Sequence, residues 1–146
     1  MKKYKKTRAL SLADAAYLAG LVDGEGTLTL VRKHRNEYRQ LGLFVSSTEK
    51  VLRNFVKTAT GDGKITTKKI AESHHSQSFT YAVYNRQALM LLEQIHPFLK
   101  SYKKKRSALI LKHYLELTPR NGKYSEQLLL KKRVFENRVL NTKANG

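Results

Sequence analysis

The nine residues Leu18–Gly26, reading LAGLVDGEG, join an apolar stretch of small residues directly to two acids. The pattern predicts a helix over Leu12–Val22, with Ser11 as its N-cap, followed by an acid-glycine turn. The helix dipole disfavours carboxylates at the C-terminal end of a helix. Asp23 and Glu25 therefore call for a compensating cation, and a metal ion is the obvious candidate.

One face of this predicted helix carries almost no side chain, because Ala16, Gly20 and Gly24 recur every four residues. Leu18, Leu21 and Val22 fall on the opposite side. A face of small residues lets another backbone approach closely. Two interpretations stay open at this point, which are packing within the protein's own core and contact with a second chain.

The charge of the chain points to a polyanion. Among 146 residues there are 29 Lys and Arg against 11 Asp and Glu, a net charge of +18. The basic residues are spread over the whole sequence, whereas a basic tail would concentrate them at one end. Nucleic acid is the expected partner, ahead of an acidic membrane. A non-catalytic basic binder of the ribosomal type shares this charge and remains an alternative.

The length fits one domain, 1–146, with a basic arm at 1–11 and an appended C-terminal helix at 125–140. The absence of Cys excludes disulfides, zinc-thiolate sites and thiol nucleophiles. Asp14 interrupts the apolar stretch that follows the basic N-terminus, which argues against a secretory signal. The run Ala15–Val22 is too short to span a bilayer. We therefore expect an intracellular protein without a membrane partner.

Two hairpins, each followed by a helix, make up most of the remaining chain. Alternation predicts strands at Thr27–Arg35 and Tyr38–Ser46, with Leu41, Leu43 and Val45 on one face, and a second hairpin of Lys64–Ile70 with Ser78–Tyr84. Four further helices are predicted: one capped by Ser47 or Thr48 that stops at Gly61–Gly63, one capped by Asn85 that runs through Ile95, one capped by Ser101 over about Lys103–Leu117, and one that starts at Ser125 and runs to about Leu140. The order α-β-β-α-β-β-α predicts an α+β fold with a four-stranded antiparallel sheet backed by helices.

The segment Leu18–Gly26 resembles the signature of the LAGLIDADG homing endonucleases, from which it differs at Val22, Gly24 and Glu25. The two basic hairpins, the segment Pro97–Arg106 (PFLKSYKKKR) and the overall length extend the resemblance over most of the chain. It implies the LAGLIDADG-type fold, with a saddle-shaped sheet in the major groove of DNA. A single motif implies a homodimer in which Ala16, Gly20 and Gly24 form the interface.

The resemblance also implies a site-specific endonuclease that cleaves both strands of a long pseudo-palindromic double-stranded DNA target. It further implies an origin inside an intron or intein. Cleavage would depend on Mg²⁺ (or Mn²⁺), for which oxygen ligands are suited. Glu25 and the Gly24 carbonyl oxygen are the expected ligands, and Asp23 either joins them or caps backbone N–H groups. Glu25 replaces the usual Asp and adds one methylene, which we do not take as a sign of inactivity.

Three further catalytic residues follow from the resemblance. Glu49 and Lys103 fall at positions near the metal-bound water, and Arg53 falls one helical turn after Glu49. Lys104 takes the place of Lys103 if the alignment shifts by one residue. Glu49 has a structural alternative as well, because an acid in the first turn of a helix complements the dipole.

DNA contacts are expected from the polar side chains of both hairpins, because Lys, Arg and Gln reach phosphates and base edges. The predicted contact residues are Arg32, Lys33, His34, Arg35, Tyr38, Arg39, Gln40, Lys64, Thr66, Lys68, His75 and Ser78. The histidines lack the spacing of a zinc site. An RNA maturase on the same fold, which binds intron RNA without cleaving DNA, is the other alternative; an intact Glu25 and Lys103 weigh against it.

Overall fold

The computed structural model of the chain describes residues 7–32, 34–36, 38–67 and 77–144. Its elements are α1 (Leu12–Glu25), β1 (Gly26–Val31), β2 (Gln40–Ser47), α2 (Lys50–Thr60), β3 (Lys64–Thr67), β4 (Phe79–Tyr84), α3 (Asn85–Ile95), the 3₁₀ helix η1 (His96–Phe98), α4 (Tyr102–His113) and α5 (Glu126–Asn141). The predicted α+β class and the order of the first seven elements are confirmed.

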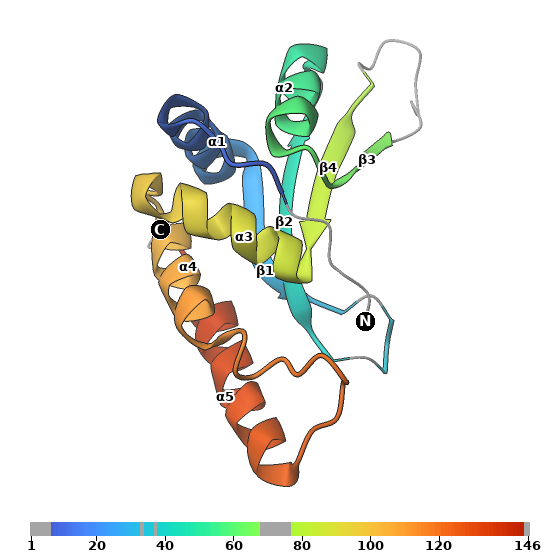
Figure 1. Cartoon of the computed structure of the whole chain (residues 1–146), viewed down its shortest axis with the longest axis vertical. Helices are drawn as coiled ribbons and strands as arrows, with labels where there is room; N and C mark the ends of the chain where they lie inside the picture. Colours follow the sequence, from blue (N-terminus) through green and yellow to red (C-terminus); the bar gives the residue numbers. More distant parts are fainter. Residues whose placement is uncertain (1–6, 33, 37, 68–76, 145–146) are drawn as a thin grey trace.

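The four strands form one antiparallel sheet in the order β1-β2-β4-β3. The two hairpins meet through β2 and β4, where Leu43 lies opposite Val83. Gly26, the first residue of β1, lies opposite Val45 near the end of β2. Helices α1, α2 and α3 lie over one face of this sheet (Figure 1). The end of α1 therefore lies at the same edge of the sheet as the end of β2.

The core lies between the sheet and these helices. Leu41, Leu43 and Val45 are buried as the alternation predicts, and Leu18 and Val22 of α1 belong to the same apolar cluster. This cluster continues through α3 and α4 to Phe135 and Val139 of α5. Each fully buried Leu contributes roughly 1.5–3 kcal/mol relative to an exposed one. The sheet is thereby held on a rigid helical layer, and its other face carries the more exposed side chains.

The first hairpin is shorter than the sequence predicts. The strand β1 ends at Val31 instead of Arg35, and residues 34–36 form a bend and turn. The strand β2 begins at Gln40 instead of Tyr38 and extends to Ser47. Beyond Val31 the alternation carries only polar side chains, which bury nothing, so the ladder ends with the apolar face. In the second hairpin β3 ends at Thr67, and the remainder of the predicted strand lies outside the described residues.

The predicted caps Ser11 and Ser101 are confirmed, and Ser125, predicted to start the last helix, caps it. The hydroxyls of Ser11, Ser101 and Ser125 accept backbone hydrogen bonds in the first turns of α1, α4 and α5. The helix α4 ends at His113 instead of Leu117.

The predicted caps of α2 and α3 are wrong. Glu49 occupies the N-cap position of α2, and Ser47 accepts the Glu49 N–H at 3.0 Å. Asn85 is the first residue of α3 and not its cap. Its Oδ1 accepts a hydrogen bond of 2.8 Å from the hydroxyl of Tyr114, the residue that follows α4, and the side chain therefore does not cap α3.

Part of the predicted basic arm is docked on the fold. The Arg8 N–H donates to Thr60 O at 2.9 Å, and its guanidinium donates to Thr58 O at 3.1 Å. The Leu10 N–H donates to the side chain of Gln94 at 2.7 Å. Arg8 thus places a cation at the C-terminal end of α2, where the dipole favours it. Within the described ranges, no helix has the length and apolar character needed to cross a bilayer.

Candidate metal site and nucleic-acid interface

Glu25 is the last residue of α1, and its side chain is exposed. It has no hydrogen bond or salt bridge with any residue that the structure describes. Gly24, immediately before it, is exposed as well. The helix α1 thus continues three residues beyond the predicted Val22, so both acids lie in its last turn and not in a separate turn.

Asp23 has its carboxylate fully engaged with the start of α4. Its Oδ2 accepts the Lys100 N–H at 2.8 Å, and its Oδ1 accepts the Ser101 N–H at 3.2 Å and the Ser101 hydroxyl at 2.5 Å. Burial opposes ionisation, but these hydrogen bonds and the charge of Lys103 outweigh it and hold the pKa of Asp23 below its ordinary value. The geometry supports the capping alternative for Asp23 and leaves it poorly placed as a metal ligand.

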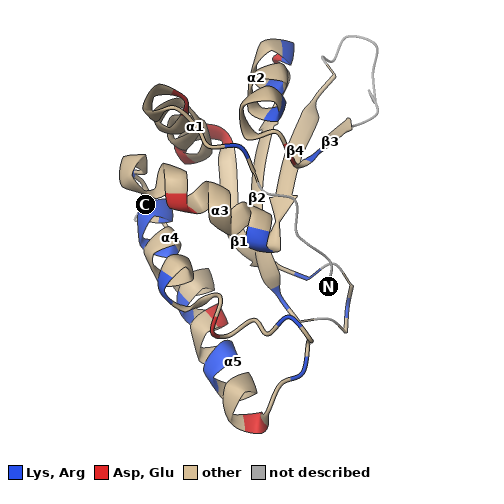
Figure 2. Ribbon diagram, viewed as in Figure 1, with Lys and Arg blue, Asp and Glu red and all other residues tan. Residues whose placement is uncertain are grey.

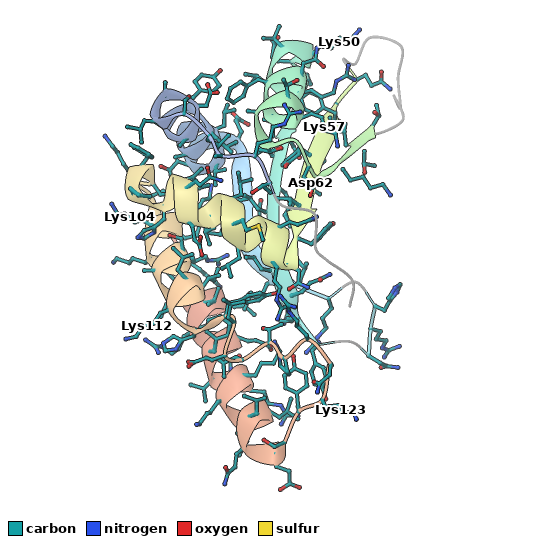
Figure 3. All side chains as sticks on the ribbon, in the orientation of Figure 1. Lys50, Lys57, Asp62, Lys104, Lys112 and Lys123 are labelled. Carbon is teal, nitrogen blue, oxygen red and sulfur yellow. The ribbon has the colours of Figure 1, made fainter. Side chains whose placement is uncertain are left out.

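Lys103 lies buried against the end of α1. Its Nζ donates to Val22 O at 2.7 Å and to Asp23 O at 3.0 Å. Burial lowers the pKa of Lys103, and the carboxylates of Asp23 and Glu25 offset part of that effect. The ammonium is therefore held by backbone carbonyls of α1, close enough to Glu25 for an electrostatic interaction. Lys104, the alternative candidate, is exposed on the outer side of α4 (Figure 3).

These contacts explain most of the unfavourable placement of acids at the end of α1. Asp23 lies at the N-terminal end of α4, where the dipole favours an anion. Lys103 lies at the C-terminal carbonyls of α1, where the dipole favours a cation. The two helix ends cap each other, and the sequence argument that both acids require a metal is wrong for Asp23. We call Val22, Asp23, Ser101 and Lys103 the α1–α4 junction.

We expect the Asp23→Asn variant to lose stability in a pH-dependent manner. Hydrogen bonds to a charged group stabilise by about 1.5–3 kcal/mol, and this half-buried group belongs at the lower end. Because the folded pKa is lowered, the stabilisation is present above the ordinary carboxyl pKa of 3.8 and is lost as the pH falls through the folded value. Urea titrations at several pH values should show the two proteins differing most at neutral pH. A difference that grows on acidification would contradict the assignment.

The end of α1 offers magnesium two of the three predicted ligands, Glu25 and Gly24, because the Asp23 carboxylate is engaged elsewhere. Among the described residues no group of three or more His, Cys, Asp or Glu side chains lies together as a metal site. Magnesium usually takes one or two carboxylates from protein, keeps several waters and binds substrate phosphates. The free carboxylate of Glu25 and the carbonyl oxygen of Gly24 are sufficient on that basis.

Glu49 and Arg53 lie at the same edge of the sheet as Glu25. Because Gly26 pairs with Val45, the residues that follow β2 lie beside the end of α1. The Glu49 side chain is exposed and makes no capping hydrogen bond, but it lies at the N-terminus of α2, where the helix dipole favours an acid, so the dipole alternative stays open. The Arg53 guanidinium lies 6.0 Å from the centre of the Phe79 ring. The structure gives neither residue a contact with Glu25.

The uncovered face of the sheet is polar and aromatic and carries few cations. The register places Thr27, Phe44, Ala82 and Lys64 in one row across the four strands. In the next row Ser46 and Thr80 share a hydrogen bond of 2.8 Å. Phe44 and Tyr84 pack edge to face, with ring centres 5.6 Å apart. The prediction that Arg and Lys line this face is wrong for β1, because its basic residues fall beyond Val31.

The predicted DNA-binding residues divide into four groups. Gln40, Lys64 and Thr66 lie on the uncovered face of the sheet, and Ser78 directly precedes β4. Arg32, His34, Arg35 and Tyr38 are exposed on the connection between β1 and β2. Arg39 is half-buried. Lys33, Lys68 and His75 lie outside the described residues.

Arg39 is less available for DNA than the sequence suggests. Its Nη1 donates to Leu30 O at 3.1 Å, and its Nε lies 3.9 Å from the Glu136 carboxylate. Tyr38 packs on Tyr124 with ring centres 4.3 Å apart. These contacts fasten the connection between β1 and β2 to α5 and to the segment before it.

The helix α1 exposes an apolar face opposite the core. Ala15, Leu18, Ala19 and Val22 are buried, whereas Leu12 and Tyr17 are 78% and 50% exposed. The small residues Ala16, Gly20 and Gly24 lie on this outer face. A Cβ added at Gly20 or Gly24 meets no atom within 4 Å. The interpretation that the stripe packs within the protein's own core is therefore wrong for this chain.

Ser101 and the sheet hydroxyls are site residues that the sequence analysis missed. Ser101 was identified only as a helix cap, and its bond to Asp23 joins residues 78 positions apart. The hydroxyls of Ser46 and Thr80 become visible only when the register of β2 and β4 is known. The alternation of each strand was the available signal for the sheet residues, and no local signal marked Ser101.

No protein-family model and no curated protein matches this chain. Solved structures do match it. The homing endonuclease I-CvuI in complex with its target has a TM-score of 0.71 at 18% identity, covering 92% of this chain and 85% of that one. The archaeal intron-encoded homing endonuclease I-Vdi141I complexed with DNA has a TM-score of 0.64 at 15% identity, covering 92% and 86%.

The LAGLIDADG homing endonuclease I-GzeII in complex with its DNA target matches with a TM-score of 0.65 at 15% identity. The match covers 88% of this chain but only 44% of that one. This protein therefore has the fold of the LAGLIDADG homing endonucleases, and the resemblance seen in the sequence is confirmed at the level of fold.

Proposed function

We propose that this protein is a homing endonuclease that cleaves both strands of a long, roughly palindromic DNA target. The observation that carries the proposal is Glu25, an exposed carboxylate that makes no hydrogen bond or salt bridge with the described residues. It ends a helix at the edge of a sheet whose uncovered face is free for a ligand. A purely structural role accounts for Asp23 but leaves Glu25 unexplained. The net charge of +18 suits a partner as acidic as DNA.

Glu25 and the Gly24 carbonyl would hold a magnesium ion, with DNA phosphates completing its shell. The bound ion would polarise the scissile phosphate and activate a water molecule for hydrolysis. I-CvuI was crystallised with DNA in the presence of calcium and of magnesium, which supports a divalent ion here. The chain's own contribution is to keep the Glu25 carboxylate exposed and fixed in direction at the end of α1.

Lys103 is best described as a positioning residue. Its ammonium binds the carbonyls of Val22 and Asp23 and so fixes the last turn of α1, on which Glu25 is carried. Glu49 and Arg53 lie at the same edge of the sheet, and we propose that they orient water or phosphate beside Glu25. The α1–α4 junction thus supplies rigidity, and the residues at the start of α2 supply polar groups.

The active form would be a homodimer joined through α1. A helix that is apolar on both sides is normally buried on both sides. The core covers one side, and a second copy of α1 would cover the outer face across a two-fold axis. The two Glu25 residues would then lie near the axis, one for each DNA strand. I-GzeII, which this chain covers by less than half, has additional length in a single chain, which agrees with a unit that acts in pairs.

The decisive experiment is a cleavage assay. The protein is incubated with magnesium and with the intron-minus allele of the gene that carries its own coding sequence. We expect double-strand cleavage at one site, which chelation of the metal abolishes. Binding to this DNA without any cleavage in magnesium or manganese would refute the endonuclease and favour a non-catalytic binder.

We further expect Gln40→Ala and Lys64→Ala to change which base pairs are preferred in a selection of cleavable sites. Both side chains lie on the uncovered face of the sheet, and Gln and Lys read base edges in the major groove. Each lost base contact should cost roughly 1–3 kcal/mol of discrimination at its position. Lys112→Ala, on the outer surface of α4 (Figure 3), is the control and should leave the preference unchanged. If the control variant changes the preferred base pairs, the uncovered face of the sheet is not the surface that reads the DNA.

A further inference from the structure

A small basic cavity lies between the connection of β1 with β2 and the helix α5. Arg32 and Arg35 line it from the connection, and Lys132 and Arg133 line it from α5. Figure 2 shows basic positions along both segments. Among the described lining residues the only carboxylate is that of Glu136, which also lies 3.9 Å from Arg39. Four cations thus line one cavity with a single carboxylate, which Arg39 already contacts.

The cations of this cavity are poorly satisfied by the protein itself. Arg32, Arg35 and Arg133 make no hydrogen bond or ion pair with the residues that the structure describes. Lys132 is only 2% exposed; its Nζ lies 5.4 Å from the centre of the Tyr124 ring, and its single hydrogen bond in the described part of the chain, to Leu117 O, is 3.5 Å long. An ammonium has three donors, and 3.5 Å lies beyond the usual length of such bonds. Like charges gathered in one cavity repel one another, and a bound anion would relieve that repulsion.

The size of the cavity indicates the kind of anion. Its volume is about 210 Å³, below the roughly 300–1,000 Å³ of sites for drug-sized molecules. Arg presents a planar fork of donors that matches phosphate oxygens. A single phosphate group suits both the volume and the donors.

The position of the cavity indicates where that phosphate belongs. The connection begins at Val31, at the opposite end of β1 from Glu25. Six residues of β1 span about 20 Å, and one strand of B-DNA advances about 3.4 Å per nucleotide, so the separation corresponds to roughly six base pairs. A duplex bound across the uncovered face would pass the cavity at its outer flank.

We propose that this cavity is a phosphate-binding subsite that holds one backbone phosphate of duplex DNA. This inference depends on the proposed function in one respect, which is that the phosphate belongs to DNA. The subsite would add to affinity without reading sequence, because phosphate contacts fix position and carry no base information. It would also give α5 a direct role in DNA binding.

The test compares Arg133→Gln with Lys131→Gln. Both residues are exposed, both lie on α5 and both changes remove one positive charge, but Lys131 lines a different surface. Lys132 itself is unsuitable, because its burial makes misfolding the expected result. In the first measurement inorganic phosphate is titrated into the full chain and followed by nuclear magnetic resonance. We expect shifts at Arg32, Arg35 and Lys132 in the wild type and in Lys131→Gln, and none in Arg133→Gln.

In the second measurement the affinity for a random-sequence duplex is determined at several salt concentrations. Arg133→Gln should reduce the slope of log affinity against log salt by about 0.9, the value for one phosphate contact on B-DNA. Lys131→Gln should leave the slope unchanged. Equal slopes for the two variants would overturn the DNA subsite, and phosphate shifts without a slope change would show a site for free anions only.

A third arm replaces the duplex by RNA of the same length. A larger effect of Arg133→Gln on RNA than on DNA would overturn DNA as the ligand. Cleavage is measured separately on the wild type. If the wild type cuts no DNA while the slopes differ as expected, the subsite stands and the proposed endonuclease fails.

Discussion

Cleavage by the Glu25→Gln variant is expected to fall by about 10²–10⁴-fold, with DNA affinity almost unchanged. Glutamine preserves the shape of the side chain but removes the charge that would hold magnesium. Metal ions supply several kcal/mol of transition-state stabilisation in hydrolysis, and each 1.36 kcal/mol is tenfold in rate. Binding should persist because phosphate contacts dominate affinity. Single-turnover cleavage and equilibrium binding on one duplex measure the two effects.

Two control variants make this result specific. Glu126→Gln removes one exposed acid from the start of α5 and should cleave at the wild-type rate. Glu25→Asp keeps the charge with a shorter side chain and should retain most of the activity. Because Glu25 is exposed and makes no hydrogen bond in the described structure, Glu25→Gln should unfold like the wild type. Wild-type cleavage by Glu25→Gln would refute the metal assignment.

Local patterns predicted the architecture well where a face had to be buried. Leu41, Leu43 and Val45 alternate because the sheet has one covered side, and the structure buries all three. Ser11, Ser101 and Ser125 cap helices because their hydroxyls satisfy backbone groups of the following turn. Burial and capping act over a few residues, so a single sequence is sufficient to read them.

Contacts between distant segments account for the errors. Asp23 and Lys103 form bonds across 77 to 81 residues, and no local rule shows that two helix ends will cap each other. The sequence analysis therefore offered a metal ion as the cation beside Asp23, whereas residues at the start of α4 compensate the charge of this carboxylate. Arg39 was expected on DNA for its type and position, and its contact with Glu136 on α5 redirects it. In each case contacts between distant segments determine which polar side chains remain available to bind a ligand.

The sequence consequently identified the residues of the candidate site better than it identified what each residue does. Glu25 was identified because two acids follow an apolar helix, and it is the acid that the fold leaves free. Lys103 was identified by resemblance alone, and its burial on α1 carbonyls follows only from the packing of α4. The basic cavity on α5 was missed because Arg32 and Arg133 are a hundred residues apart in the sequence.

If the proposed dimer forms through α1, Gly20→Leu should convert it to a folded monomer and abolish cleavage of both strands together. Apart from its chain neighbours and the backbone of its own helix, a Cβ at Gly20 meets no described atom within 4 Å, so the outer face of α1 leaves room for a larger side chain in the isolated protomer. Leucine also favours a helix over glycine by about 0.8–1 kcal/mol, which should stabilise α1. In the dimer the same side chain would hold the two α1 helices apart and displace both Glu25 carboxylates. Sedimentation and circular dichroism should therefore show a smaller, fully folded species.

The contrast with Gly26 separates this interface effect from ordinary destabilisation. A Cβ at Gly26 would lie 2.6 Å from Val22 Cα and 3.0 Å from Phe44 O, both of them backbone atoms. Gly26→Ala should therefore lower the unfolding temperature of the protein itself, whereas Gly20→Leu should not. Gly20→Ala, with a single methyl group, should retain more dimer than Gly20→Leu. A stable, active dimer of Gly20→Leu would show that the two copies do not meet through this face of α1.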